Sequence, residues 1–329
     1  MHLTGRLLLA GLLLAAGAAT PAASHAAAQD ATPATPAACA AMTSDQSREV
    51  AAAFMDRLNA SDLDGMAAMV APDAVYSSAT QGEKTGPRGV ADALGAILQA
   101  YPDAVHETKA VIADGNAAVV RWTARGINTG PLLGREPTGE AREWEGMFLF
   151  RMECGLIAGA RSAVEQAAAL GLPGADARQE PDAPAATPGP CEPMSREAMR
   201  AAVATFWTDG WNAGNVAVSR ELAAPGIVQH WVTGDDTRGA DAGAVRLEAL
   251  FAGMPDLAIS WDDILVDGDL AAAAWTWRGT DTGGMFGQPP TGRAVDYDGI
   301  SIFRFACGKI AETWTEGDVN RMLAQLAGS

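Results

Sequence analysis

The stretch that decides the fold is PTGRAVDYDGISIFRFACGKIAETWTEGDV, which runs from Pro290 to Val319. A related stretch, PTGEAREWEGMFLFRMECGLIAGARSAVEQ, runs from Pro137 to Gln166. Thr138 and Thr291 take the same place in the two stretches, 153 residues apart. The chain therefore repeats itself, and the fold to be explained is that of one unit used twice.

The same offset holds over most of each copy. Identical residues recur 153 positions apart, as in Asn59 and Asn212, Pro102 and Pro255, Trp122 and Trp275, and Gly134 and Gly287. A constant offset with so long a period indicates two tandem globular domains rather than a solenoid. The segment LPGADARQEPDAPAATPGPCEP between them is rich in Pro, Ala and Gly, which is typical of a linker. We therefore expect a first domain over residues 43–172, a linker over 173–193 and a second domain over 194–329.

The order of helix and strand patterns predicts the fold class. In the second copy, helical spacing of apolar residues covers 196–214, 216–222 and 243–253, and strand patterns cover 225–232, 257–268, 270–280, 293–305 and 309–317. A short helix is expected over 319–326. Ser195 is a candidate N-cap, and Thr43 with Gln46 resembles a capping box that opens the first copy. Helices on one side of a curved antiparallel sheet make an α+β cone, so we expect two cone-shaped domains in tandem.

The N-terminus has the pattern of an export signal. A short basic segment, MHLTGR, precedes the apolar run LLLAGLLLAAGAA and the small residues of SHAAA. We predict a signal peptide over residues 1–28 and a linker over 29–42. No later segment reaches about 18 unbroken apolar residues, so the mature protein is expected to be soluble, with no membrane contact after cleavage. The predicted location is the periplasm or the medium.

Composition narrows the partners. The 329 residues are 48% hydrophobic and 19% charged, which is typical of a globular chain. The formal net charge is −17, and no run of Lys or Arg interrupts it. Such a surface repels phosphate backbones, so nucleic acid and anionic membranes are excluded as partners.

The four cysteines predict two disulfides. In an exported chain an even number of cysteines favours disulfide bonds, and four cysteines allow three pairings. Cys39 and Cys154 are 115 residues apart and Cys191 and Cys307 are 116 apart, so each copy has one Cys before its first helix and one in a late turn. The repeat therefore predicts Cys39–Cys154 and Cys191–Cys307. No Cys lies at ligand spacing from another Cys or a His, so no metal site is expected.

Several motifs of the second copy point to a known family. The segments PDLAISWDDILVDGD, GTDTGGMFGQPPTGRAV, GISIFRF, GKIAETWTEGD and LAQLAG resemble the SnoaL-like polyketide cyclase family, within the nuclear-transport-factor-2-like superfamily. The resemblance covers residues 194–328. The first copy keeps many of the Pro, Gly and Trp residues at the repeat offset. It departs from the motif GKIAETWTEGD near the end of the second copy, where it has GLIAGARSAVE instead.

The resemblance implies a cone with an apolar pocket and a reaction that needs no metal or organic cofactor. Characterised members close a ring by intramolecular aldol condensation, with one Asp as acid and base. That residue matches Asp318, and a strand His matches His230. A buried carboxyl can serve both steps because burial raises its pKa, and an imidazole can hold a carbonyl or assist proton transfer.

Aromatic residues supply the expected pocket wall, since seven of the nine Trp lie in the second copy. Trp275 and Trp277 are two apart and so share one sheet face. The full set of pocket candidates is Trp275, Trp277, Trp314, Tyr297, Phe286 and Met254. Other interpretations stay open. Asp318 also fits the N-cap of the last helix, and His230 also fits a surface or core histidine. The sheet face that carries Trp275 and Trp277 also fits plain hydrophobic core.

The first copy lacks the candidate catalytic residues. At the repeat offset, Ser77 replaces His230, Gly159 replaces Glu312, Arg161 replaces Trp314 and Glu165 replaces Asp318. We therefore expect the first copy to fold without catalysing the reaction. Members of the superfamily often dimerise through their sheets. The first copy is expected to fill that partner position within one chain, as an intrachain pseudo-dimer.

Three functions remain in competition at this point. One is a cofactor-independent cyclase or isomerase-like enzyme that acts in the second copy. Another is a non-catalytic protein that binds an apolar small molecule outside the cytoplasm. The third is a disulfide-linked interaction module. An enclosed cavity where Asp318 and His230 converge favours the enzyme, whereas an apolar cavity without such groups favours the binding protein.

Overall fold

The structure is a computed structural model, and it describes residues 39–78, 81–170, 191–232, 236–285 and 288–328. Residues Cys39–Ser329 form one compact unit. The predicted signal peptide (1–28) and most of the two predicted linkers (29–42 and 173–193) lie outside the described residues.

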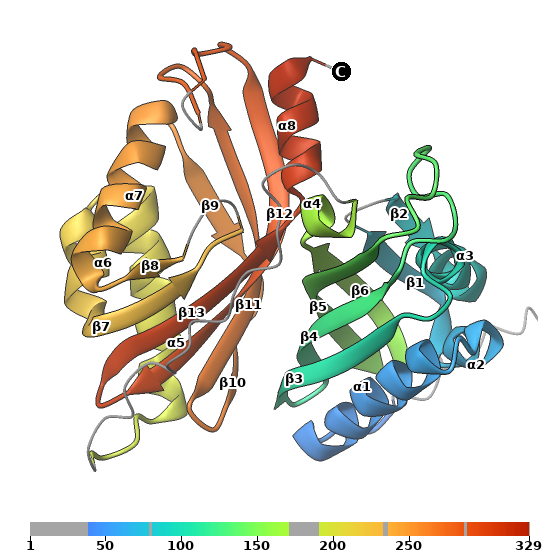
Figure 1. Cartoon of the computed structure of the whole chain (residues 1–329). Coiled ribbons are helices and arrows are strands. Elements are labelled where there is room, and N and C mark those ends of the chain that lie inside the picture. Colours follow the sequence, from blue (N-terminus) through green and yellow to red (C-terminus); the bar gives the residue numbers. More distant parts are fainter. Residues whose placement is uncertain (1–38, 79–80, 171–190, 233–235, 286–287, 329) are drawn as a thin grey trace, which may run out of the picture. The chain divides into compact units, whose positions relative to one another are not determined.

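The first copy consists of helices on one face of a six-stranded sheet (Figure 1). Its elements are α1 (Ser44–Asn59), α2 (Leu63–Ala68), β1 (Val70–Ser78), β2 (Gly82–Thr85), α3 (Gly86–Ala100), β3 (Val105–Asp114), β4 (Ala117–Ile127), β5 (Ala141–Glu153), β6 (Leu156–Val164) and α4 (Gln166–Ala169). The strand order is β2-β1-β6-β5-β4-β3.

The second copy repeats this plan. Its elements are α5 (Arg196–Thr205), the π-helix η1 (Phe206–Asn212), α6 (Val216–Leu222), β7 (Ala223–His230), β8 (Thr237–Arg238), α7 (Ala240–Gly253), β9 (Ala258–Trp261), β10 (Leu265–Asp267), β11 (Leu270–Thr280), β12 (Ala294–Ala306), β13 (Lys309–Gly317) and α8 (Val319–Ala327). The strand order is β10-β11-β12-β13-β7-β8, and β9 also pairs with β11. The chain thus contains the two α+β domains that the sequence predicts.

Each sheet is mixed rather than purely antiparallel. The last long strand of each copy pairs in parallel with the first, β6 with β1 and β13 with β7, while the other pairs are antiparallel. The two parallel strands of each copy are far apart in the chain. A helix, α3 or α7, and several strands lie between them, and this long connection lets the last strand run in the same direction as the first.

Two helix starts follow the expected capping chemistry. The Thr43 side chain accepts a hydrogen bond from the Gln46 backbone, and the Gln46 side chain accepts one from the Thr43 backbone. The Ser195 side chain accepts from the Ala198 backbone at the start of α5. Both groups satisfy backbone N–H donors that a first helical turn leaves without partners, which confirms these predictions.

Equivalent asparagines fix each first helical segment to its sheet. The Asn59 side chain donates to the carbonyl oxygen of His106 at 2.9 Å and accepts from its N–H at 2.7 Å. Asn212 makes the same two bonds to Ile259, at 2.9 and 2.7 Å. The repeat of Asn59 and Asn212 in the sequence therefore corresponds to the same pair of side-chain to backbone hydrogen bonds in each domain.

Two sequence expectations for the second copy need correction. The expected helix over 196–214 is α-helical only to Thr205 and continues as a π-helix. The expected strand over 257–268 is split into β9 and β10, with residues 262–264 outside both strands, although the Asp262 N–H still donates to the Ala274 carbonyl of β11 at 2.9 Å. The first copy keeps the corresponding strand, β3, in one piece.

Both faces of each sheet are buried. In β11, Ala273 and Trp275 belong to the core under the helices, whereas Ala272 and Ala274 belong to a separate apolar cluster. This intersheet cluster contains Ile112, Ala117, Val119, Met147, Leu149 and Ala163 from the first copy and Leu265, Ala272, Ala274, Ile300 and Ile302 from the second. The sheet faces that lie away from the helices therefore pack against each other.

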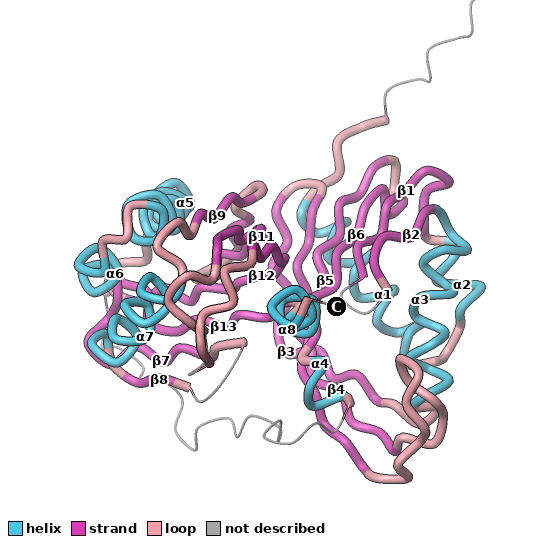
Figure 2. Tube along the Cα trace, turned by 90° about the horizontal axis from the view of Figure 1, so that it is seen from above, coloured by secondary structure: helices cyan, strands magenta, loops and turns pink. Residues whose placement is uncertain are grey.

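Each copy ends in a helix at the same repeat position. Helix α4 begins at Gln166 and α8 at Val319, and Figure 2 shows the two helices side by side. Helix α8 is the longer of the two, with its N-cap at Asp318.

The two predicted disulfides are confirmed. Cys39 is bonded to Cys154 and Cys191 to Cys307, each with Cα atoms 5.3 Å apart. Cys154 and Cys307 both have positive φ, 54° and 50°, in the turns that end β5 and β12. Each disulfide ties the segment before a first helix to the sheet of the same copy.

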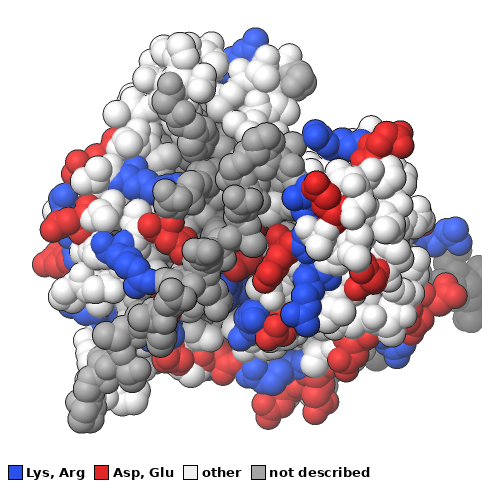
Figure 3. Space-filling model, in the orientation of Figure 1, with Lys and Arg blue, Asp and Glu red and all other residues white. Residues whose placement is uncertain are grey.

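Charge on the surface is mixed in sign. On the face in Figure 3, Lys and Arg side chains are interspersed with Asp and Glu. In the described part of the chain, no helix is both long and apolar enough to cross a membrane.

Candidate functional site

A cavity of about 410 Å³ lies between the helices and the sheet of the second copy. Its wall is mainly aromatic. The Trp and Tyr side chains that line it are Trp207, Trp211, Trp231, Trp275, Trp277 and Tyr297. A concave, largely apolar site of this size fits a small organic molecule.

The π-helix η1 supplies one wall of the cavity. A π-helix bonds residue i to i+5, so its turn is wider than an α-turn, and such turns are frequent at functional sites. Here it carries Trp207 and Trp211, which both line the cavity. The rings of Trp211 and Trp277 meet nearly at right angles, with centroids 6.3 Å apart, which is a favourable aromatic geometry.

Strand β11 supplies the floor. Trp275 and Trp277 both line the cavity, as their spacing predicts. The Trp275 ring lies over Gly299, its partner in β12, and a Cβ at that position would collide with the ring. Gly146 stands in the same relation to Trp122 in the first copy. A glycine is needed here because the indole lies flat across the neighbouring strand.

A few polar groups interrupt the aromatic wall. They are Gln229, Arg246, Tyr297, Ser301, Thr313 and Thr315. Ser301 accepts a hydrogen bond from the indole N–H of Trp275 at 2.9 Å and lies 3.0 Å from the Thr315 hydroxyl. Among the described lining residues there is no carboxylate and no histidine, and Arg246 is the one charged group.

Tyr297 is held inside the aromatic wall and is 3% exposed. Its ring centroid lies 5.3 Å from that of Trp275 and 4.8 Å from that of Trp277. Burial raises the pKa of the Tyr297 hydroxyl, and the charge of Arg246 lowers it only in part. The hydroxyl therefore stays protonated at ordinary pH.

The six predicted pocket residues fall into four groups. Trp275, Trp277 and Tyr297 line the cavity. Met254 is buried in the adjoining core and is not a lining residue. Trp314 belongs to the opposite face of the sheet, where it packs against the intersheet cluster. Phe286 lies outside the described residues.

His230 does not line the cavity. Its chain neighbours, Gln229 in β7 and Trp231 just after that strand, both line the cavity, so the alternation of side chains places His230 on the opposite face of the sheet. Its Nδ1 lies 2.6 Å from Asp236 and its Nε2 lies 3.2 Å from Glu312. The expectation that His230 is a pocket residue is therefore corrected.

Charged and aromatic groups surround His230 on that face. Its ring stacks on Trp314, with centroids 5.5 Å apart and planes 11° apart. Arg304 donates two hydrogen bonds, of 2.8 and 3.0 Å, to Glu312. Burial alone would lower the pKa of His230, but its hydrogen bonds to Asp236 and Glu312, with their charges, raise it above the ordinary value.

Asp318 caps helix α8. Its carboxylate accepts a hydrogen bond from the backbone N–H of Arg321 at 2.9 Å, and it is not among the described lining residues of the cavity. The N-cap interpretation of Asp318 therefore describes its place in the fold. Asp318 and His230 do not converge on this cavity.

Sequence reasoning missed several lining residues. The sequence places Trp207 and Trp211 only in an amphipathic helix, and the π-helical turn that redirects them leaves no clear sequence signal. Trp231 carries the same alternation signal as Trp275 and Trp277, since it flanks His230 in the strand pattern. Arg246 stands in an apolar helix, GAVRLEALFAG, where a lone Arg was the available signal.

Packed aromatic side chains occupy the corresponding interior of the first copy. The rings of Phe148 and Phe150 stack at 5.6 Å, and Tyr101 and Trp144 lie 4.6 Å apart. His106 packs edge-on against Trp122 at 5.1 Å. Both copies thus place aromatic side chains in their interiors, with different ring contacts in each.

Comparison with protein families accounts for this duplicated frame. Residues 201–326 match the family described as SnoaL-like polyketide cyclase, and residues 51–160 match the SnoaL-like domain. The chain carries two SnoaL-like domains in tandem. The resemblance read from the sequence motifs is confirmed, and it extends to the first copy, whose terminal motif has diverged.

Solved structures named as polyketide cyclases are each similar to less than half of this chain. A protein from Jannaschia sp. CCS1 named as a SnoaL-like polyketide cyclase is 23% identical, with 43% of this chain and 99% of that chain covered and a TM-score of 0.39. IdmH from Streptomyces antibioticus, named as a polyketide cyclase, is 30% identical, with 39% and 96% covered and a TM-score of 0.34. No curated protein matches the chain.

Proposed function

We propose that the second SnoaL-like domain binds an apolar small molecule, and that the protein does so after export. The cavity of about 410 Å³ carries this proposal, because five Trp and one Tyr surround a space with few polar groups. Buried aromatic rings provide apolar contact and stacking for a flat or bulky apolar molecule.

Binding accounts for the cavity better than acid and base chemistry at Asp318. That chemistry needs a titratable group beside the reacting carbon. The described lining residues contribute only Arg246 and Tyr297 as titratable groups, and both stay protonated at ordinary pH. The family match supports a second candidate, cofactor-independent ring closure, for which Asp318 would have to reach the bound molecule.

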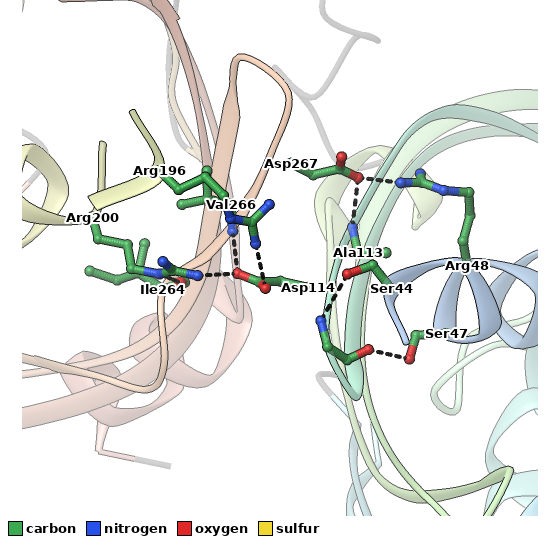
Figure 4. A network of polar contacts seen from close by, with 11 residues as sticks. Ser44, Ser47, Arg48, Ala113, Asp114, Arg196, Arg200, Ile264, Val266 and Asp267 are labelled. Atoms are coloured by element: carbon green, nitrogen blue, oxygen red, sulfur yellow. Dashed lines mark hydrogen bonds and ion pairs between the residues drawn. The ribbon is translucent and has the colours of Figure 1, made fainter. Parts of the chain in front are cut away.

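The proposal gives the first copy the role of a built-in partner. The intersheet cluster joins apolar residues of both sheets. Arg121 of β4 lies over the Trp314 ring, 5.0 Å from its centroid. At one end of the contact, Asp114 of the first copy pairs with Arg196 and Arg200 of the second at 2.5 Å each (Figure 4). An intrachain pseudo-dimer explains why a copy that lacks the candidate catalytic residues is retained.

Export is supported by the N-terminal sequence and by the disulfides. The signal-like pattern of residues 1–28 precedes the compact unit. Two disulfides, Cys39–Cys154 and Cys191–Cys307, persist best in an oxidising compartment such as the periplasm or the medium.

The test is binding of N-phenyl-1-naphthylamine, a neutral apolar probe that fluoresces when bound. We compare the purified chain with Ala249→Trp, which places an indole at the cavity wall. Ala242→Trp is the matched control, because Ala242 is also an exposed alanine of α7 but is not among the lining residues. We expect saturable 1:1 binding by the wild type and the control, and weak binding by Ala249→Trp.

Absence of saturable binding by the wild type would reject the binding proposal. Equal binding by Ala249→Trp and Ala242→Trp would place the probe elsewhere and reject the cavity. For the ring-closure candidate, Asp318→Asn should abolish turnover of a dicarbonyl substrate, and failure of the wild type to turn over any such substrate counts against it.

A further inference from the structure

Arg246 introduces a positive charge into a wall that is otherwise neutral. Among the described lining residues it is the one charged group, in a chain whose net charge is −17. It projects from the middle of α7 and is half-buried, so its charge is partly removed from water. A cation in such a place attracts negative charge in the ligand more strongly than an exposed arginine does.

The guanidinium of Arg246 is positioned by Trp231. Its central carbon lies 4.8 Å from the centroid of the Trp231 ring, which is within cation–π range. The Trp231 ring is itself fixed, because its indole N–H donates to the Thr237 hydroxyl at 2.9 Å. A guanidinium stacked on a ring keeps its N–H groups in the plane for an acceptor that approaches from the side.

Tyr297 adds a second donor to the same region. Burial raises the pKa of the Tyr297 hydroxyl, and the positive charge of Arg246 opposes this shift. The Tyr297 ring is held between Trp275 and Trp277, and both it and Arg246 line the cavity. A buried phenol that stays protonated donates its hydrogen bond at any ordinary pH.

We propose that Arg246 and Tyr297 bind an anionic oxygen group, a carboxylate or enolate, at one end of an otherwise apolar ligand. This inference rests on the proposed binding function and narrows its ligand class. Charge-assisted hydrogen bonds are about twice as strong as neutral ones and are directional, so this pair would orient the ligand in the aromatic wall. A purely structural Arg246 would instead act through its packing on Trp231.

The test compares two probes that share one skeleton. 1-Anilinonaphthalene-8-sulfonate carries a sulfonate, whose oxygens stand in for the anionic group, and N-phenyl-1-naphthylamine is the same skeleton without it. We expect Arg246→Gln to weaken binding of the sulfonate by about 10-fold or more, and to weaken binding of the neutral probe much less. Arg246→Lys should recover part of the loss, since the charge returns without the planar fork.

Two further variants sharpen the comparison. Tyr297→Phe removes one neutral donor and should weaken binding of the sulfonate by about 2- to 10-fold, which is more than it weakens binding of the neutral probe. Arg278→Gln is the matched control, because Arg278 is an exposed arginine next to Trp277 that is not among the lining residues. It lowers the net charge in the same way as Arg246→Gln and should leave both probes unaffected.

The outcomes separate this inference from the function on which it rests. If neither probe binds the wild type saturably, the binding function itself fails. If the neutral probe binds but Arg246→Gln does not change the sulfonate, anion recognition fails while the binding function stands. Equal weakening of both probes by Arg246→Gln would show a structural role and overturn the inference.

Discussion

Asp114 and Asp267 stand at equivalent places in the two copies, and each accepts a backbone hydrogen bond from the other copy. Asp114 accepts from the N–H of Val266, and Asp267 accepts from the N–H of Ala113, both at 3.0 Å. Ala113 and Val266 are themselves equivalent residues. The contact is therefore reciprocal, because each copy offers an equivalent carboxylate and an equivalent backbone N–H to the other.

Arginines from the two helical layers complete this contact. Asp267 pairs with Arg48 of α1, and Asp114 pairs with Arg196 and Arg200 of α5. These arginines are not at equivalent positions in the two copies, so the repeat extends to the carboxylates but not to the arginines that pair with them. Asp114 and Asp267 are the last residues of the equivalent strands β3 and β10, so both carboxylates can accept from the equivalent backbone N–H of the other copy.

Removing either carboxylate should loosen the contact between the copies. We expect Asp114→Ala and Asp267→Ala each to lower the free energy of unfolding by about 1–2 kcal/mol, since partly exposed ion pairs contribute little beyond the backbone bond. Urea unfolding measured by tryptophan fluorescence gives the value. Asp269→Ala, an exposed residue in the same turn as Asp267, is the control. Losses no larger than that of the control would contradict the role of this contact.

The charged cluster at His230 should make stability depend on pH. The pKa of His230 is raised in the folded protein, so the stabilisation is fully present below about pH 6.5, the unfolded value, and is lost as pH rises through the folded value. Urea unfolding between pH 5 and pH 9 measures this. The free energy of unfolding should fall toward alkaline pH in the wild type, and His230→Asn should remove that slope. If the slope persisted in His230→Asn, the pH dependence of stability would have to come from another titratable group.

His106 should act in the opposite direction. Burial lowers its pKa to about 4, so the folded first copy resists protonation that the unfolded chain accepts. Stability should decline by roughly 3 kcal/mol as pH falls from about 6.5 to 4. His106→Phe, which keeps a ring against Trp122, should flatten this acid decline in urea unfolding curves. An unchanged decline would mean that carboxylates, rather than His106, govern acid unfolding.

Each disulfide should stabilise the chain substantially. The loops between Cys39 and Cys154 and between Cys191 and Cys307 span 115 and 116 residues. Loops of this length predict about 4–5 kcal/mol of stabilisation each in the chain-entropy picture. Replacing both cysteines of one pair by Ser, followed by equilibrium unfolding, measures the effect. Free energies equal to the wild-type value would show that the sheet contacts alone hold the ends of each copy.

The frame of the fold could be predicted because its signals are local or repeated. The offset between Trp122 and Trp275 shows the duplication, and strand alternation places Trp275 with Trp277 on one face. The cysteine spacing selects the disulfide pairing for the same reason. None of these inferences requires knowledge of which sheet face meets the helices.

The site could not be predicted as reliably because both sheet faces are buried. In β13, Thr313 and Thr315 line the cavity while Glu312 and Trp314 lie on the other face. An aromatic residue normally marks the covered face of a sheet, but here the first copy covers the second face too. Trp314 therefore resembles a pocket residue in the sequence. His230, whose ring stacks on Trp314, lies on the same face and is misassigned for the same reason.

The most direct test of the account is the ¹⁹F NMR spectrum of the protein labelled with 5-fluorotryptophan, recorded with and without N-phenyl-1-naphthylamine. The account predicts that the probe shifts the resonances of the lining residues Trp207, Trp211, Trp231, Trp275 and Trp277, each assigned by substitution with Phe. Trp122, Trp144 and Trp314 should not move. A shift of Trp314, beside His230, with the five lining residues unmoved would contradict the central claim and place the site on the opposite face of the sheet.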